Sequence, residues 1–310
     1  MRPPLAPGAA ASLCVGLTAL LLLVGNTLLW CTALFLLALL KLLLPFARLR
    51  APIDRALNEV ATRWISGNCA WMRLTQRTAW DIAGPSALDP GRWYLVTCNH
   101  QSWVDIFVLQ RVFNRRIPLL KFFLKRELFY VPVMGLAWWA LDFPFMKRQS
   151  SRVQADVETS RRACERFARV PTSVMNFVEG TRVTAGKRDR QRSPYRHLLK
   201  PKTGALAASL ETLGEKFDAA LDVTIVYPAG APSFRDFLCG GVPEVVVRYE
   251  EVPLPEGVTT GMVSSGDGRA RLAAWLAGVW ARKDAMIEDI LARARTGPAH
   301  EGGPGKRGAC

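Results

Sequence analysis

The chain begins with a long apolar segment. No charged side chain occurs between Pro3 and Leu40, and residues 13–40 are interrupted only by small residues, threonines and Asn26. As an α-helix, these 28 residues would extend about 42 Å, against about 30 Å for the hydrocarbon core of a bilayer. The apolar part of a signal peptide is shorter, about 7–15 residues. The pattern predicts a retained membrane anchor over residues 1–45, which either spans the bilayer or enters one leaflet.

After this anchor, short apolar runs alternate with segments of helical periodicity. Runs typical of buried strands occupy residues 93–98, 173–178, 221–227 and 244–249. Helical character marks residues 53–78, 153–169 and 269–295. The alternation predicts an α/β fold, with a mixed central sheet flanked by helices. The predicted parts are the anchor (1–45), a helical linker (46–90), an α/β domain (91–295) and a disordered tail (296–310).

Composition adds a strong positive charge to this picture. The chain has 310 residues, a net charge of +15 and 50% hydrophobic residues, which indicates an anionic partner such as nucleic acid, a membrane surface or a phosphorylated substrate. Residues 111–202 contain 21 basic and 7 acidic residues. Beside a membrane anchor, this excess favours binding to anionic membrane lipids. We predict no nucleic-acid partner, because the sequence contains no recognisable nucleic-acid-binding module.

The charges that flank the apolar segment predict its orientation. Only Arg2 and the amino terminus are positive before it, whereas Lys41, Arg48, Arg50 and Arg55 follow it. The positive-inside rule therefore places the rest of the chain on the cytoplasmic side of a single N-terminal span. The 7 cysteines are scattered without a Cys-x-x-Cys pair, and there are only 3 histidines. These counts predict a reduced compartment and no metal site.

The first cluster of chemically active residues follows the predicted strand at 93–98. It contains Asn99, His100 and, five residues after the histidine, Asp105. If a helix starts nearby, its first turn can return the carboxylate to the imidazole, where it would orient the ring and raise its basicity. The alternative is a structural histidine next to an aspartate that begins a helix.

A second cluster follows the predicted strand at 173–178. Its residues are Glu179, Gly180, Thr181 and Arg182. The glycine allows close approach to a ligand, the hydroxyl can hydrogen-bond, and the guanidinium can bind a phosphate with two N–H groups. The alternative is a strand-to-loop turn that carries a surface ion pair.

Together, these His-x-x-x-x-Asp and Glu-Gly-Thr-Arg motifs resemble the PlsC-type glycerophosphate and lysophosphatidate acyltransferase family. Three further blocks occur in the family's order, at residues 135–148 with closing Arg148, 201–205 with Lys202, and 223–228 with Pro228. The resemblance covers roughly residues 60–250. The whole-chain pattern is most similar to the bacterial YihG-like branch.

The resemblance implies a membrane-bound enzyme of the bacterial inner membrane that has no cofactor. It would move a fatty acyl group from acyl-CoA or acyl carrier protein to a hydroxyl of a lysophospholipid acceptor similar to 1-acyl-glycerol-3-phosphate. His100 and Asp105 would be catalytic. The residues implied in substrate binding are Asn99, Arg148, Glu179, Gly180, Thr181, Arg182 and Lys202.

Other interpretations stay open at this point. The acceptor could be another membrane amphiphile of the lipid A type, or the chain could be a non-catalytic, membrane-anchored protein that binds anionic lipid. The aromatic-rich segment 128–146 could form an acyl-chain slot, an interfacial foot or ordinary core.

Overall fold

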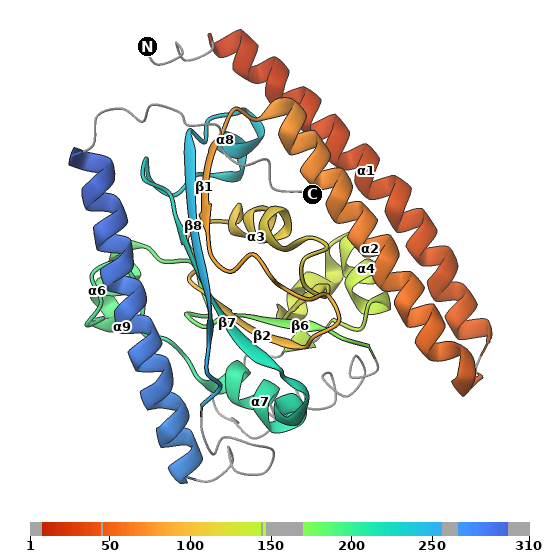
Figure 1. Ribbon diagram of the computed structural model, residues 1–310. Helices are drawn as coiled ribbons and strands as arrows, with labels where there is room; N and C mark the ends of the chain where they lie inside the picture. The colour runs from red at the N-terminus through yellow and green to blue at the C-terminus, as the bar shows by residue number, and fades with distance from the viewer. Residues whose placement is uncertain (1–7, 45, 144, 147–169, 256–265, 297–310) are drawn as a thin grey trace.

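The computed structural model describes residues 8–44, 46–143, 145–146, 170–255 and 266–296 (Figure 1). The predicted helix at 153–169, the predicted tail beyond residue 296 and Arg148 lie outside the described residues. A six-stranded sheet occupies the centre of the molecule. A pair of long helices lies at one side of the sheet, and the C-terminal helix lies at the other.

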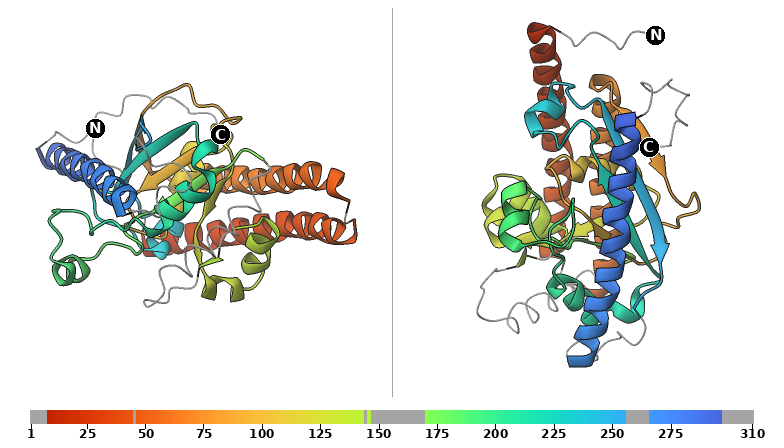
Figure 2. Two further views of the ribbon diagram at one scale, coloured as in Figure 1. Left: turned by 90° about the horizontal axis from the view of Figure 1, so that it is seen from below. Right: turned by 90° about the vertical axis from the view of Figure 1, so that its left-hand side faces the viewer.

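The first two helices, α1 (Ala9–Leu43) and α2 (Ala47–Thr75), form an antiparallel hairpin (Figure 2). Near the middle of α1, the Asn26 Nδ2 donates to the Trp64 carbonyl at 2.9 Å and to Asn68 Oδ1 at 3.0 Å. At its end, Lys41 pairs with Asp54 at 2.7 Å. The middle of α1 thus meets the later part of α2, and the end of α1 meets the start of α2, so the contacts hold the helices side by side.

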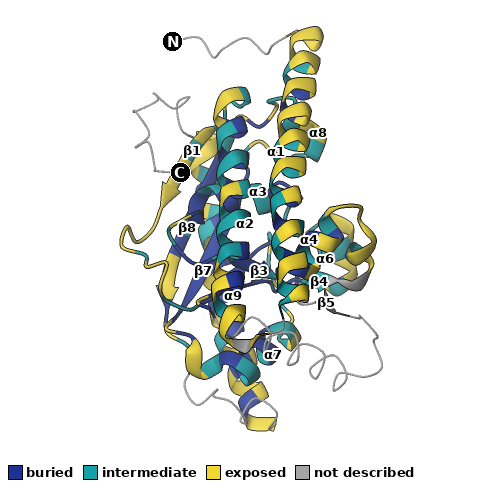
Figure 3. Cartoon of the chain, turned by 90° about the vertical axis from the view of Figure 1, so that its right-hand side faces the viewer, coloured by how far each residue is buried: buried dark blue, intermediate teal, exposed yellow. Residues whose placement is uncertain are grey.

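The outer face of α1 stays apolar and exposed (Figure 3). Leu21, Leu29 and Leu43 are 73%, 65% and 68% exposed. By length and composition, α1 is the one described helix that could cross a membrane. The predicted N-terminal helix is therefore present, and it packs against the rest of the chain through one side only.

The central sheet has the strand order β1-β8-β7-β2-β6-β3. Its strands are β1 (Ala79–Ala83), β2 (Tyr94–Cys98), β3 (Leu120–Phe122), β6 (Ser173–Phe177), β7 (Ala219–Val226) and β8 (Glu244–Val252). Neighbouring strands are parallel except β7 and β8, which are antiparallel. The predicted mixed α/β sheet is confirmed. All residues of β2 are buried, because β2 lies between β6 and β7 and is covered on both faces.

The sheet begins earlier in the chain than the predicted boundary at residue 91. Strand β1 falls within the predicted helical linker, yet it pairs in parallel with β8 from Ala79 opposite Glu244 to Ala83 opposite Arg248. Four of its five residues are exposed. This edge strand therefore has no apolar run that a sequence pattern could detect.

Helices cover both faces of the sheet. Helices α2, α3 (Asp105–Phe113) and α8 (Phe234–Leu238) pack on one face. Helices α7 (Gly204–Leu213) and α9 (Gly266–Thr296) pack on the other. The short helices α6 (Ala185–Gln191) and η2 (Gly214–Lys216) lie in the connections. Helix α9 confirms the helix predicted at 269–295.

A small apolar unit closes the space between the helical hairpin and the sheet. It consists of β4 (Leu124–Lys125), η1 (Arg126–Tyr130), α4 (Met134–Ala140) and β5 (Phe145–Met146). Ala137, Ala140, Leu141 and Phe143 pack with residues of α1 and α2. Strands β4 and β5 form a separate two-stranded sheet.

The face of the sheet under α9 contains a buried charged pair. Lys283 is 1% exposed, and its Nζ lies 3.0 Å from Asp222 Oδ1 and 3.1 Å from Thr224 Oγ1. It also donates to the Val223 carbonyl. Because both charged groups are shielded from water, each is stabilised mainly by the opposite charge of the other.

We expect Lys283→Ala to lower the free energy of unfolding by about 3–5 kcal/mol, because the substitution leaves the Asp222 carboxylate buried without its cation. The double variant Lys283→Met/Asp222→Leu should recover most of that loss. Urea unfolding monitored by circular dichroism measures both. The exposed neighbour Arg282 supplies the control, Arg282→Ala, which should be near wild type. A double variant no more stable than Lys283→Ala would contradict this account.

Candidate active site

The loop between β2 and α3 brings together the two residues of the first motif. His100 follows the end of β2, and Asp105 is the first residue of α3. The His100 Nδ1 lies 2.9 Å from Asp105 Oδ2. The Asp105 side chain is completely buried and that of His100 is 14% exposed. The histidine–aspartate pair predicted from the sequence is therefore present.

The Asp105 carboxylate is surrounded by hydrogen-bond donors. Its Oδ2 accepts from the backbone N–H of Gln101 at 2.7 Å and of Ser102 at 2.9 Å, and its Oδ1 accepts from the Tyr227 hydroxyl at 2.7 Å. Burial and the adjacent Asp105 carboxylate raise the pKa of Tyr227 well above its ordinary value, so the phenol remains a donor. A helix N-terminus also favours a negative charge at this position.

These contacts determine the orientation of the His100 ring. Because Asp105 only accepts hydrogen bonds, the ring donates from Nδ1, and Nε2 is the nitrogen that carries the lone pair of the neutral imidazole. The ring also stacks on Phe177, with centroids 4.0 Å apart and planes at 17°. No described residue hydrogen-bonds to Nε2. His100 lines a cavity, so this nitrogen is available to accept a proton there.

Glu179, predicted to bind substrate, holds two backbone N–H groups. It is completely buried, and its Oε2 accepts from the His100 backbone N–H and its Oε1 from that of Leu199, both at 2.9 Å. Burial raises the pKa of Glu179 from 4.5 to about 7, although both hydrogen bonds oppose the shift. The carboxyl thus ties together the loops after β2 and β6, and its contact with substrate stays a prediction.

Asn99, also predicted to bind substrate, pairs with the backbone of β7. The side chain is completely buried. It donates from Nδ2 to the Ile225 carbonyl at 2.8 Å and accepts from the Ile225 N–H at 2.9 Å. Asn99 therefore clamps β2 to β7 and lies outside the cavity lining.

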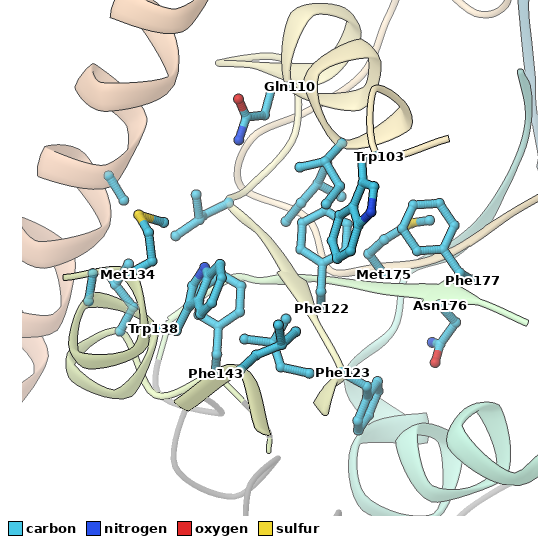
Figure 4. A pocket seen from close by; sticks show the side chains of 18 of the residues that line it. Trp103, Gln110, Phe122, Phe123, Met134, Trp138, Phe143, Met175, Asn176 and Phe177 are labelled. Carbon is cyan, nitrogen blue, oxygen red and sulfur yellow. The ribbon is translucent and has the colours of Figure 1, made fainter. Parts of the chain in front are cut away.

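A cavity of about 810 Å³ lies between the helical hairpin, α4 and the edge of the sheet (Figure 4). Its wall is mostly apolar and aromatic, with Trp103, Phe122, Trp138, Phe143, Met175 and Phe177 among the side chains that face it. Segment 128–146 contributes Leu128, Met134, Ala137, Trp138, Leu141 and Phe143. An acyl-chain slot formed by segment 128–146, one of the predicted alternatives, requires that its side chains line the cavity in this way.

The polar side of the cavity is formed by the second motif and by Lys202, just before α7. Gly180, Thr181, Arg182 and Lys202 all line it. Gly180 has φ 71°, a left-handed conformation that favours glycine. The Arg182 guanidinium lies 5.2 Å from the centre of the Trp103 ring. Arg182 and Lys202 are exposed cations, so this side can receive an anionic group.

The structure therefore sorts the predicted residues into two groups. His100 and the four residues of the polar side line the cavity, whereas Asp105, Glu179 and Asn99 support the loops from behind. Tyr227 was not predicted. Its only signal in the sequence was a hydroxyl-bearing residue next to Pro228, at the end of a buried strand. Within the described residues, no group of three or more His, Cys, Asp or Glu could hold a metal ion.

Comparison with known proteins gives consistent matches. Residues 80–229 match the family model described as Acyltransferase. Lysocardiolipin acyltransferase 1 of Danio rerio is 26% identical over 245 residues, 74% of this chain and 61% of that protein. The gamma 1-acyl-sn-glycerol-3-phosphate acyltransferase of Mus musculus is 27% identical over 208 residues, 63% of this chain and 52% of that protein. The chain thus spans roughly half to three fifths of these relatives' lengths.

A solved structure shares the fold. The crystal structure of the 1-acyl-sn-glycerophosphate (LPA) acyltransferase PlsC from Thermotoga maritima matches with a TM-score of 0.52 at 17% sequence identity. The match covers 91% of this chain and 97% of that chain. It extends the similarity over the helical hairpin as well as the sheet. The YihG-like branch stays a prediction, because none of these matches tests it.

The buried Glu179 carboxyl should make stability depend on pH. Its pKa is raised in the folded state, so the folded protein holds a proton that the unfolded chain releases between pH 4.5 and about 7. The free energy of unfolding should fall by about 3 kcal/mol as pH rises through this interval. Urea unfolding between about pH 4.5 and about pH 8 measures the slope.

Glu179→Gln removes the titrating proton and should flatten this pH dependence, even though the variant loses one backbone hydrogen bond. The control is Glu215→Gln, at an exposed glutamate of η2, which should retain the wild-type slope. The same slope in Glu179→Gln and wild type would show that another group causes the pH dependence.

Proposed function

Residues 80–229 make the chain a member of the acyltransferase family, and we propose that it transfers a fatty acyl group from a thioester donor to a hydroxyl of a lysophospholipid. The observation that carries the proposal is the His100–Asp105 pair, whose free imidazole nitrogen is available at a large apolar cavity. Relatives named for acylation of 1-acyl-glycerol-3-phosphate and of lysocardiolipin support this acceptor class.

His100 acts as the general base in this proposal. As the acceptor hydroxyl attacks the thioester carbonyl, its proton passes to His100 Nε2, while Asp105 stabilises the positively charged ring. The new ester forms and the thiolate of the donor leaves, taking up the proton from the imidazole. Tyr227 and the two backbone N–H groups keep Asp105 in place for this role.

The remaining parts of the cavity bind the substrates. The apolar wall accommodates acyl chain, because burial of each methylene contributes about 0.8 kcal/mol. Arg182 and Lys202 neutralise the phosphate of the acceptor, and Thr181 contributes a hydroxyl. Arg148, outside the described residues, is proposed as a further phosphate ligand from its position in the family's second block.

The donor is acyl-CoA or acyl carrier protein, and no cofactor is required. A covalent acyl-enzyme is not part of the proposal. Cys98, the cysteine directly before the first motif, is no candidate nucleophile. It is completely buried, and burial raises the pKa of its thiol well above the ordinary value. A protonated, inaccessible thiol is a poor nucleophile.

The decisive test measures acylation of lysophosphatidate by labelled acyl-CoA, and by labelled acyl carrier protein, with purified protein in mixed micelles. His100→Ala should lower kcat by about 10²–10⁴-fold, the usual contribution of a general base. His197→Ala is the matched control and should retain wild-type turnover. The His197 Nε2 lies 2.7 Å from Glu288 Oε2, and His197 is not part of the cavity lining.

Equal turnover of His100→Ala and wild type would remove the assigned base. If wild type acylates neither lysophosphatidate nor lysocardiolipin with either donor, the proposed activity is wrong, and a lipid A-type acceptor or a non-catalytic lipid-binding role becomes the better interpretation.

The apolar face of α1 attaches the chain to a membrane in this proposal, on the cytoplasmic side of the bacterial inner membrane. The exposed cations of the 187–202 segment, among them Arg190, Arg192, Arg196 and Lys200, would contact anionic headgroups. This arrangement lets a lipid acceptor reach the cavity without crossing water.

We propose that α1 lies in one leaflet instead of crossing the bilayer. Its late half packs against the α2 segment that carries the exposed Arg55 and Arg63. A perpendicular span would carry these arginines into hydrocarbon at about 2.5–3.5 kcal/mol each. An in-plane position buries the exposed leucines and leaves α2 at the surface.

Leu21→Lys/Leu29→Lys should reduce cosedimentation with phosphatidylglycerol–phosphatidylcholine vesicles more than tenfold, because two charges would enter the apolar region. The control, Ala277→Lys/Arg282→Lys on the exposed face of α9, should bind as wild type does.

A second experiment tests whether α1 crosses the bilayer. If α1 lies in one leaflet, a protease added outside the vesicles should remove an N-terminal tag; a protected tag would favour a full span.

A further inference from the structure

Gln110 is a polar side chain in the mostly apolar wall of the cavity, away from the His100 pair. Gln110 of α3 is 6% exposed and lines the cavity. Figure 4 shows its amide extending from α3 toward the space between α3 and the hairpin. Trp64, Ile65 and Ile106 line the same cavity from the helices on either side. A polar amide in such an apolar wall is expected to have hydrogen-bond partners for both its oxygen and its nitrogen.

The orientation of the amide follows from a chain of hydrogen bonds that begins at a tryptophan. The Trp71 indole N–H can only donate, and it donates to Asn68 Oδ1 at 3.2 Å. Asn68 must therefore present its NH₂ on the other side, where it donates to Gln110 Oε1 at 3.0 Å. The Gln110 oxygen is thus occupied, and its NH₂ group points elsewhere.

A second contact supports the same assignment. Asn26 donates from Nδ2 to the Trp64 carbonyl and to Asn68 Oδ1. A carbonyl can only accept, so the Asn26 amide cannot be flipped, and Asn68 Oδ1 must again be the acceptor. The network joins α1, α2 and α3 and holds the Gln110 side chain still.

The Gln110 Nε2 is left as an N–H donor at the cavity. No described residue accepts a hydrogen bond from it. The side chain is only 6% exposed, and a donor that faces a mostly apolar cavity gains a hydrogen bond when an acceptor enters. The apolar neighbours on the cavity wall offer none, so the acceptor has to come from what enters the cavity.

The position along α3 shows which part of a lipid this donor meets. Gln110 is five residues after Asp105 on the same helix, about 7.5 Å along the axis. The reacting carbonyl and hydroxyl must lie at His100, which Asp105 contacts. Gln110 is therefore about one and a half turns further on, beside the body of a bound lipid.

We propose that Gln110 is a specificity-determining residue whose Nε2 donates a hydrogen bond to an oxygen atom carried by the lipid in the cavity. The inference rests on the proposed function for the identity of the bound lipid. Two sources supply such an oxygen. One is a hydroxyl or keto group along the donor acyl chain, and the other is the ester carbonyl of the chain already present on the lysolipid.

The donor source is tested by equilibrium binding of free fatty acids, which needs no catalysis. Stearic acid and a series of hydroxystearic acids with the hydroxyl moved along the chain compete with a fluorescent fatty acid for the full-length protein. We expect one hydroxyl position to bind about threefold to tenfold more tightly than its neighbours, the usual net effect of one hydrogen bond.

The acceptor source is tested with a pair of lysophosphatidates that differ by one oxygen. The ester-linked 1-acyl form carries the carbonyl, and the ether-linked 1-alkyl form lacks it. Under turnover, the ratio of kcat/KM for ester over ether should be about threefold to tenfold if Gln110 donates to that carbonyl.

Gln110→Met keeps the length of the side chain and removes the donor, so it should bring the preference found in either arm to about one. The matched control is Ile106→Leu, four residues earlier on the same helix and lining the same cavity. It should change affinity for both members of a pair together and keep their ratio. Because each readout is a ratio within one protein, partial destabilisation of a variant cancels.

The proposal is overturned if wild type shows no preference in either arm, or if a preference survives Gln110→Met. A preference that disappears in Gln110→Met and persists in Ile106→Leu supports it, and the arm in which it occurs identifies the source. If the protein has no acyltransferase activity, only the turnover experiment gives no result. The fatty-acid arm would still decide whether the donor is used.

Discussion

The structure depends on how it satisfies one buried carboxylate. Asp105 is completely buried, so its charge requires compensation inside the protein. The loop after β2 folds back to supply two backbone N–H groups, Tyr227 directly after β7 supplies its hydroxyl, and the His100 ring supplies the remaining donor. The same contacts fix the loop, start α3 and orient the imidazole. Catalytic geometry and local folding are therefore one constraint.

A second buried carboxyl extends this constraint to the other motif. Glu179 holds the His100 backbone from one side and the Leu199 backbone from the other. The Val183 N–H adds a bond to the His100 carbonyl at 2.8 Å. Parallel pairing of β2 with β6 makes this possible, because the carboxyl ends of parallel strands meet at one edge of the sheet. The two motifs thus form a single rigid edge that faces the cavity.

The cavity has a different origin, in the helical hairpin. Part of α2 packs on the sheet, whereas most of the hairpin projects beside it, and polar contacts through Asn26, Asn68 and Lys41 join the hairpin's helices to each other and to α3. The space that it encloses with α4 is apolar, as acyl chains require. The hairpin also presents leucines outward. One structural unit therefore provides both a membrane-facing surface and a wall of the substrate cavity.

The sequence by itself determined the elements whose signals are local. The apolar helix, the four buried strands, the C-terminal helix and both motifs follow from spacing and composition, because neighbours in the chain set them. Tertiary structure decided what depends on distant partners. Tyr227 meets Asp105 across 122 residues, and Glu179 meets His100 across 79. The exposed strand β1 forms only because it pairs with β8. Asn99 and Glu179 are buried after strands β2 and β6, where they hold the backbone of neighbouring segments. The direction of the Gln110 amide depends on three helices, which no local pattern encodes.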